Sequence, residues 1–425
     1  MNGAANGPFV SDAGWLLGLC AARAGFATIF TAYSAALPLL TADWAMTGGE
    51  AGLVQSSYHL GFLVSLFAVG FLSDHFGARR VYLWSSLAAA ASGLAFAFGA
   101  DGFLSGLLLY GLAGLCSGGS YTPGLALIAE RFAGHYQGRA MGFYLAAASL
   151  GYALALLLAS AIIPLAGWRG AFVATAFGPV LAAVLGYAVL KDTPNIVHPL
   201  PPEHADRGAI RTVWHDRPVM LSIWAYVAHA WELLGLWAWL PAFLAVALAA
   251  GGTVSPEVAG LGATLSAVTY LVAAAGNAAG GALSDRFGRT AVILAMSVAS
   301  LLCSFSFGWM IGLPVWLLVL VAVLYNLFGV ADSSIHSTAL TELTPRRYLG
   351  AAYSLRSALG FAAGAVSPWI FGLVLDWGHM AELASPAWVW GLAWMSLGVG
   401  GLLGPVATLR LRRMPEAARM AGGRR

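Results

Sequence analysis

The 425-residue chain is 60% hydrophobic and only 9% charged, and its mean hydropathy is +0.78. Soluble domains carry roughly a quarter charged residues because their surfaces face water, so this composition excludes a soluble globular protein. The formal net charge of +3 is small, and we expect no nucleic-acid partner. The three cysteines lack the spacing of a disulfide framework or a metal site.

Twelve apolar runs are long enough to cross a bilayer, which takes about twenty helical residues. Six precede a polar stretch and six follow it, near 14–40, 51–72, 81–100, 102–129, 139–164, 168–190, 219–247, 258–283, 290–311, 314–340, 350–375 and 386–409. The first run is too long for a signal peptide, and we expect it to be retained. We predict an all-α membrane protein with twelve transmembrane helices in two pseudo-symmetric six-helix bundles. The bundles comprise residues 1–190 and 219–425, with a linker at 191–218.

Basic residues are concentrated in alternate loops. Of the 21 lysines and arginines, 18 fall after even-numbered spans, in the linker or in the C-terminal tail. Cytoplasmic loops carry an excess of Lys and Arg, so we expect both termini, the linker and the basic tail to be cytoplasmic. The expected location is the cell inner membrane.

The two halves repeat a loop signature. GFLSDHFGARR begins at Gly70 between the second and third spans, and GALSDRFGRT begins at Gly281 between the eighth and ninth. Asp74 and Asp285 are 211 residues apart, almost half the chain. A six-span duplication is typical of transporters built from two related halves.

With these paired loops, the six-plus-six layout and the charged central loop, the chain resembles the major facilitator superfamily over essentially its whole length. The resemblance implies a secondary transporter that works by alternating access. It also implies that the loop residues and the neighbouring span ends form gates and latches: Gly70, Asp74, Gly77, Arg79, Arg80, Glu130, Arg131, Gly281, Asp285, Gly288 and Arg289. His75 replaces a residue that is usually basic in the family, which predicts a weaker or pH-sensitive first latch. Proton-driven drug exporters typically have an arginine where Tyr110 stands, so the sequence argues against that subfamily.

Two arginines lie inside spans, where a charge costs at least about 2.5 kcal/mol. Arg23 is in the first span and Arg356 in the eleventh. We interpret them as a clamp for a carboxylate or another oxyanion, one from each half. A static pair between Arg23 and an acidic residue, and extension of Arg356 to the cytoplasmic surface, remain open.

Other polar residues lie at membrane depth in spans four, seven and ten. His229 and Glu232 share a helix face, as do Asp332 and His336, and we assign all four to proton coupling. A desolvated glutamate can carry a proton at physiological pH, although Glu232 could instead pair with Arg23. Tyr121 lies 211 residues before Asp332, after a Gly/Pro interruption at 118–124. We assign Tyr121 and Trp231, from an aromatic run in span seven, to substrate binding.

The leading hypothesis is a secondary transporter of a small organic anion such as a carboxylate, with proton coupling. Efflux of a hydrophobic or amphipathic compound is the alternative, and a non-transporting sensor or a membrane-embedded enzyme is more distant. No phosphate-binding G-x-x-x-x-G-K-[ST] loop occurs, which argues against ATP as the energy source. We expect no enzymatic activity, no cofactor and no metal. The expected partners are a small-molecule substrate, the lipid bilayer and protons, and the protein is expected to be a monomer.

Overall fold

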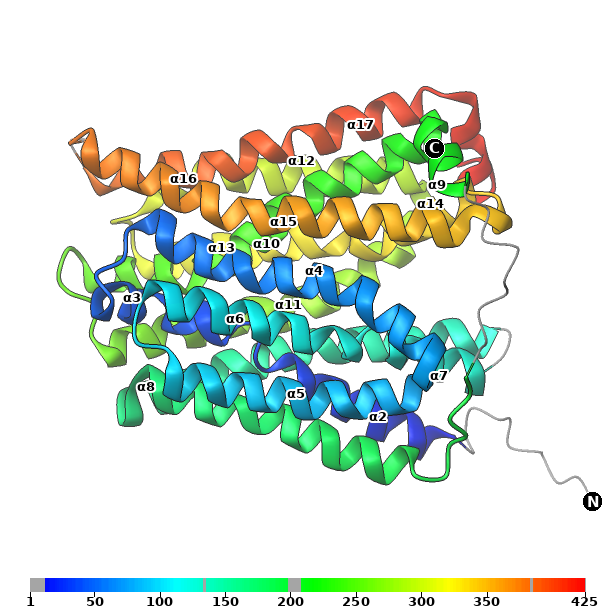
Figure 1. The fold of residues 1–425 in the computed structure, drawn as a ribbon. Coiled ribbons are helices and arrows are strands. Elements are labelled where there is room, and N and C mark those ends of the chain that lie inside the picture. The colour runs from blue at the N-terminus through cyan, green and yellow to red at the C-terminus, as the bar shows by residue number, and fades with distance from the viewer. Residues whose placement is uncertain (1–11, 133–134, 198–207, 383–384, 425) are drawn as a thin grey trace, which may run out of the picture.

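The computed structural model describes residues 12–132, 135–197, 208–382 and 385–424. Residues 198–207 of the expected linker lie outside this part. In the described part the chain folds into helices and no strands, as predicted (Figure 1). The first group is α2 (Ala13–Ala27), α3 (Ala32–Asp43), α4 (Gly48–Phe76), α5 (Ala78–Gly99), α6 (Phe103–Ser117), α7 (Thr122–Arg131) and α8 (His135–Leu190). The second is α9 (Ala209–His215), α10 (Arg217–Ala249), α11 (Pro256–Phe287), α12 (Arg289–Phe307), α13 (Val315–Ala331), α14 (Ser333–Leu343), α15 (Leu349–Met380), α16 (Pro386–Gly401) and α17 (Leu403–Arg412).

Eleven continuous segments of the described chain are long and apolar enough to cross a membrane. One of them, residues 139–190, is 52 residues long. A straight helix of that length would measure about 78 Å, more than twice the hydrocarbon thickness of a bilayer. The backbone leaves helical geometry at Gly167, where φ is 64° and ψ is −171°. This residue separates the fifth and sixth spans of the sequence analysis, so all twelve expected runs are accounted for.

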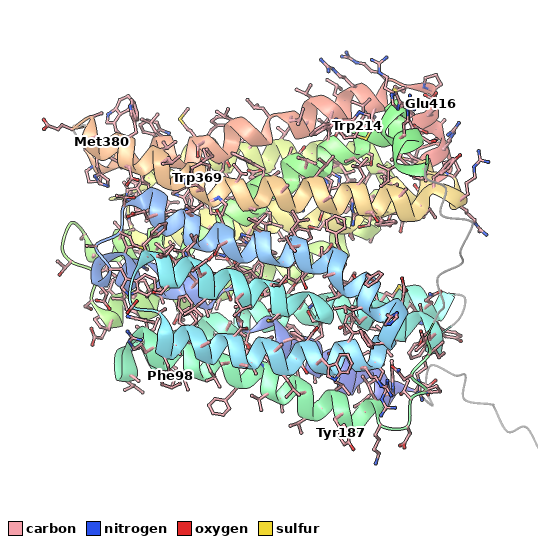
Figure 2. The ribbon with its side chains drawn as sticks, viewed as in Figure 1. Phe98, Tyr187, Trp214, Trp369, Met380 and Glu416 are labelled. Carbon is pink, nitrogen blue, oxygen red and sulfur yellow. The ribbon has the colours of Figure 1, made fainter. Side chains whose placement is uncertain are left out.

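Large apolar side chains cover the outside of the bundle. Phe98 on α5 and Tyr187 on α8 project outward and are 75% and 63% exposed (Figure 2). Such exposure would be unfavourable in water and is expected where the surrounding solvent is lipid. The protein is therefore a multi-pass membrane protein.

Three spans are broken near their middles. The first is interrupted between α2 and α3, the fourth by the short helix Gly118–Ser120, and the tenth at Asp332 between α13 and α14. The sequence predicted only the break in the fourth span. At the first break, the Thr28 hydroxyl lies 2.8 and 2.6 Å from the carbonyl oxygens of Gly25 and Thr175. The Tyr110 hydroxyl lies 3.0 Å from the carbonyl oxygen of Phe30, so a side chain satisfies a backbone group at the break, as a membrane requires.

The two groups of helices meet along α4 with α15 and along α8 with α11. Small residues allow close approach at the first contact, where Gly48 faces Gly372 and Gly52 faces Pro368. The start of α2, the end of α4 and the end of α17 lie at one end of the bundle, here named the basic end (Figure 1). The start of α4 and the end of α15 lie at the opposite end.

Candidate functional site

A cavity of about 340 Å³ lies between the two groups of helices. Three of the four residues that the sequence analysis assigned to substrate binding, Arg23, Tyr121 and Arg356, line it. Polar and aromatic side chains complete the lining, including Phe30, Tyr58, Phe62, Ser117, Ser120, Tyr152, Tyr226, His229, Trp237, Asn277, Ser333, Ser334, Ser337 and Phe361. The cavity thus receives side chains from both halves of the chain.

Arg23 on α2 is held by a hydroxyl and by aromatic rings. Its side chain is only 5% exposed, and one terminal nitrogen donates a hydrogen bond to the Ser120 hydroxyl. The guanidinium carbon lies 5.9 Å from the ring centroid of Tyr121 and 5.7 Å from that of Tyr144. Its buried Nε has no hydrogen-bond partner.

Arg356 on α15 is arranged in the same way. It donates to the Ser337 hydroxyl at 2.8 Å, and its guanidinium carbon lies 4.4 Å and 4.7 Å from the ring centroids of Tyr226 and Tyr353. Its side chain is 5% exposed, so it does not extend to the surface as one interpretation allowed. Within the described residues neither Arg356 nor Arg23 has a carboxylate in ion-pair contact. The cavity is therefore lined by two buried arginines that no carboxylate of the described residues neutralises.

Asp332 lies at the break in the tenth span, between two histidines. Its carboxylate oxygens are 2.9 Å from His229 Nδ1 and 3.4 Å from His336 Nε2. His229 Nε2 is 3.0 Å from the hydroxyl of Ser333. Donor atoms of the three ionisable residues lie within 4.8 Å of one another, so they could also hold a metal ion. The cluster can share and move protons, and His229 connects it to the cavity.

Glu232 does not pair with Arg23, which corrects one interpretation of the sequence. It is buried inside the second group of helices, where it accepts a 2.8 Å hydrogen bond from Ser304, which in turn contacts the Tyr325 hydroxyl. A pocket of about 10 Å³ lies between Glu232 and the Asp332 cluster. That volume suits a single water molecule, which could connect the two sites.

Trp231 does not line the cavity. Its indole lies against Gly400 on α16, on another side of α10 from His229. Trp237, two helical turns further along, is the tryptophan of this run that lines the cavity. Its indole nitrogen donates a 3.0 Å hydrogen bond to Asn326.

The cavity continues toward the basic end. A second space of about 810 Å³ shares Tyr121, Leu145, Ser337 and Arg356 with it and reaches Gly70 and Asp74 at the end of α4. At the opposite end α4 and α15 are in contact, and the Asp376 carboxylate accepts hydrogen bonds from the backbone of Gly48 and Gly49 at 2.6 and 2.7 Å. The site is thus open toward the basic end and closed at the other.

The two loop signatures differ in their contacts. In the second, Arg289 binds Asp285 at 2.5 Å and Glu342 at 3.0 Å. In the first, Arg79 donates to the Thr193 carbonyl oxygen at 3.0 Å, and no ion pair of Asp74 occurs among the described side chains.

The other residues predicted to form gates and latches are the glycines of both signatures, Arg80, and Glu130 and Arg131 at the end of α7. Gly77 and Gly288 adopt positive φ angles of 86° and 96° at the turns between helices, whereas Gly70 and Gly281 lie within α4 and α11. The backbone N–H of Arg80 donates to the Asn195 side chain at 3.3 Å. Arg131, at the end of α7 beside Glu130, pairs with Asp12 at 2.7 Å.

Comparison with known proteins identifies the family. The family model described as "Major Facilitator Superfamily" matches residues 19–255, more than half of the chain. The chain belongs to the major facilitator superfamily. It is therefore a transporter of the secondary type and not an enzyme, as the sequence predicted.

Relatives support this identification along most of the chain. A probable 4-methylmuconolactone transporter of Cupriavidus pinatubonensis is 25% identical, and the match covers 79% of this chain and 77% of the relative. A hexuronate transporter of Bacillus subtilis is 22% identical, over 81% and 84% of the two chains. The crystal structure of a bacterial homologue of the human lysosomal transporter Spinster, in an inward-facing and unoccupied conformation, has the same fold. It matches with a TM-score of 0.72 and 15% identity over 99% of both chains.

Proposed function

We propose that this superfamily member carries a small organic anion, with a carboxylate as the group it recognises, across the cell inner membrane together with protons. The observation that carries the proposal is the pair of buried arginines, Arg23 and Arg356, which line one cavity without a carboxylate partner among the described residues. The named substrates of the two relatives, a methylmuconolactone and a hexuronate, are organic anions of this kind.

A bound anion would stabilise the positive charges of Arg23 and Arg356. Each intramembrane arginine costs at least about 2.5 kcal/mol, and a carboxylate between the two would recover that cost through hydrogen bonds to charged donors. The planar guanidinium groups suit a carboxylate, which can accept two parallel N–H bonds. Tyr121 lies beside Arg23 and lines both spaces, so it would contact the anion on its way.

The two-part architecture supports alternating access as the mechanism. We propose that residues 1–190 and 219–425 move as two bodies joined by the linker 191–218. With the arginine-rich loops facing the cytoplasm, the basic end is cytoplasmic and the conformation described here is inward-facing. Opening to the other side would require the Asp376 contact to break and the space beside Asp74 to close. The loop residues around Asp74 and Arg289 would then act as latches, in a protein that works as a monomer.

Proton coupling is assigned to His229, Asp332 and His336, with Glu232 as a second proton site. His229 faces the cavity, so a bound anion and a proton on this cluster would be close enough to favour each other. The one-water pocket toward Glu232 offers a route for the proton into the second group of helices. Loss of the substrate would then favour release of the proton.

The aromatic lining supports a second candidate, export of an uncharged amphipathic compound. Such a compound would use the rings and would be indifferent to Arg23. The two proposals therefore differ in how transport depends on substrate charge and on this arginine.

The experiment uses purified protein in liposomes that contain a pH-sensitive dye. Small anions, cations and neutral solutes are added to wild type, Arg23→Ala and the surface control Arg347→Ala. We expect proton movement with carboxylates, lost in Arg23→Ala and retained in Arg347→Ala. Movement that requires a neutral or cationic compound and survives Arg23→Ala would refute the anion proposal and support the second candidate.

A further inference from the structure

The cavity wall between the two arginines is rich in aromatic rings. Phe30 and Tyr152 have ring centroids 4.5 Å apart, and Tyr152 and Trp237 are 5.5 Å apart. Phe62 and Phe361 form a second pair at 5.2 Å. In each cluster the rings come from both halves of the chain, and Phe62, Tyr152, Trp237 and Phe361 are only half-buried. Ring surface is thus left uncovered inside the cavity.

We propose that the transported anion is an aromatic carboxylate, a single planar ring that carries its carboxylate directly or through a short link. This inference rests on the proposed function, because the arginines must bind the carboxylate for the rings to bind the remainder. Aromatic pairs with centroids 4.5–7 Å apart gain about 0.5–1.5 kcal/mol beyond the area they bury. A flat ring between the two clusters would make several such pairs.

The polar groups of the cavity argue against a substrate with many hydroxyls. Most of the lining serine hydroxyls already have partners in the protein: Ser117 donates to Ala113, Ser120 to Ser117, and Ser334 to Asn277. The hydroxyl of Ser333 contacts His229. A sugar acid would therefore lose hydrogen bonds to water that these groups do not replace, which costs free energy for each buried hydroxyl. The cavity suits a ligand with one strongly polar group.

The volume of the cavity accommodates a small ring system. A dry apolar cavity of about 150 Å³ can hold benzene, and the space here is about 340 Å³. One ring with its carboxylate, or two fused rings, would fill it. Each guanidinium lies near two aromatic rings, donates one terminal nitrogen to a serine hydroxyl, and has no carboxylate partner among the described residues. Each half thus contributes one positive charge to the cavity lining for the carboxylate.

The test compares benzoate with a saturated carboxylate, an uncharged aromatic amide and a sugar acid. Binding of benzoate, cyclohexanecarboxylate, benzamide and glucuronate to the purified full-length protein is measured by calorimetry. Cyclohexanecarboxylate keeps the charge and size of benzoate but is not planar, and benzamide keeps the ring without the charge. We expect benzoate to bind about tenfold or more tightly than cyclohexanecarboxylate, and benzamide and glucuronate to bind weakly.

Two variants test the rings directly. Trp237→Leu and Phe361→Leu should each lower the affinity ratio of benzoate to cyclohexanecarboxylate, and the double variant should bring it close to one, while carboxylates still bind. Trp237→Leu also removes the hydrogen bond from Trp237 to Asn326, whereas Phe361→Leu removes no side-chain hydrogen bond. If Trp237→Leu impairs folding, Phe361→Leu alone provides the test. Trp316, 68% exposed on the outer surface of α13, provides the matched control Trp316→Leu, which should keep the wild-type ratio.

The outcomes separate this inference from the proposal on which it rests. Equal binding of benzoate and cyclohexanecarboxylate would overturn the aromatic substrate class and leave the anion site standing. Tight glucuronate binding would overturn it as well. Binding of benzamide as tight as that of benzoate would contradict the role of the arginines and with it the proposed function. Failure of every carboxylate in calorimetry and in the liposome assay would refute both.

Discussion

The carboxylate of Asp376, near the end of α15, caps the start of α4 in the other half of the molecule. Its oxygens accept hydrogen bonds from the backbone N–H groups of Gly48 and Gly49 at 2.6 and 2.7 Å. An anion at a helix N-terminus is stabilised by the unpaired N–H groups and by the helix dipole. The two partners belong to different halves, so this contact joins the halves at the end opposite the basic end.

Replacement of Asp376 by asparagine should favour opening at that end. The variant keeps the shape but loses the charge, and hydrogen bonds to charged groups are worth about 1.5–3 kcal/mol. A loss of about 1.4 kcal/mol shifts a two-state equilibrium tenfold. Leu375 is buried and lies beside Gly48, so Leu375→Cys in a cysteine-free background reports this opening. We expect an impermeant maleimide to label it about tenfold faster when Asp376→Asn is added.

A matched control is available in the second half. Asp216 caps α10 by accepting from the Val219 N–H at 3.2 Å, and this contact does not join the two halves. Asp216→Asn removes the same kind of charge and should leave the labelling rate unchanged. Faster labelling in this variant, or an unchanged rate in Asp376→Asn, would show that the inter-half contact does not control opening.

The sequence predicted the parts of this site that follow from its internal repeat. The 211-residue offset between Asp74 and Asp285 also relates Tyr121 to Asp332, and both lie where their spans break. Arg23 and Arg356 could be placed in one cavity because an intramembrane charge has few other stable positions. These inferences rest on the spacing of the internal repeat and on the free-energy cost of a charge in lipid. Both apply to any membrane protein built from two repeated halves.

The direction of individual side chains around α10 could not be predicted. His229 and Glu232 are three residues apart, yet His229 faces the cavity and Glu232 faces Ser304. Helix spacing gives relative angles but not which neighbour occupies each side, and α10 is covered by other helices on several sides. The contact of Asp376 with α4 could not be predicted either, because an acidic residue at the end of a span usually faces water.

The planar shape of the two arginines should matter as much as their charge. Arg23→Lys and Arg356→Lys keep a cation in the cavity but lose the fork that binds both carboxylate oxygens. We expect the KM for the most active carboxylate of the liposome panel to rise about tenfold in each, with a smaller change in kcat. Arg347→Lys at the surface is the control. Wild-type KM values in both cavity variants would indicate that a point charge suffices.

Removal of metal ions should not affect transport. The donor atoms of His229, Asp332 and His336 lie close enough to chelate an ion, but the two imidazoles are each directed at an oxygen of the carboxylate. If the cluster works with protons, transport in liposomes treated with EDTA should equal that of untreated samples. Transport that stops with EDTA and returns on addition of Zn²⁺ would instead identify the cluster as a metal site.

Asp332 and Glu232 should differ in how strictly proton coupling depends on them. Asp332 contacts His229 at the cavity, so Asp332→Asn should abolish accumulation driven by a pH gradient while substrate exchange without a gradient persists. Glu232 connects only through the one-water pocket, and Glu232→Gln can still accept the Ser304 hydrogen bond. If both variants lose accumulation and keep exchange, the proton passes through both residues. If only Asp332→Asn does, Glu232 is a structural partner of Ser304, and a fully coupled Asp332→Asn variant would contradict the assignment of the cluster.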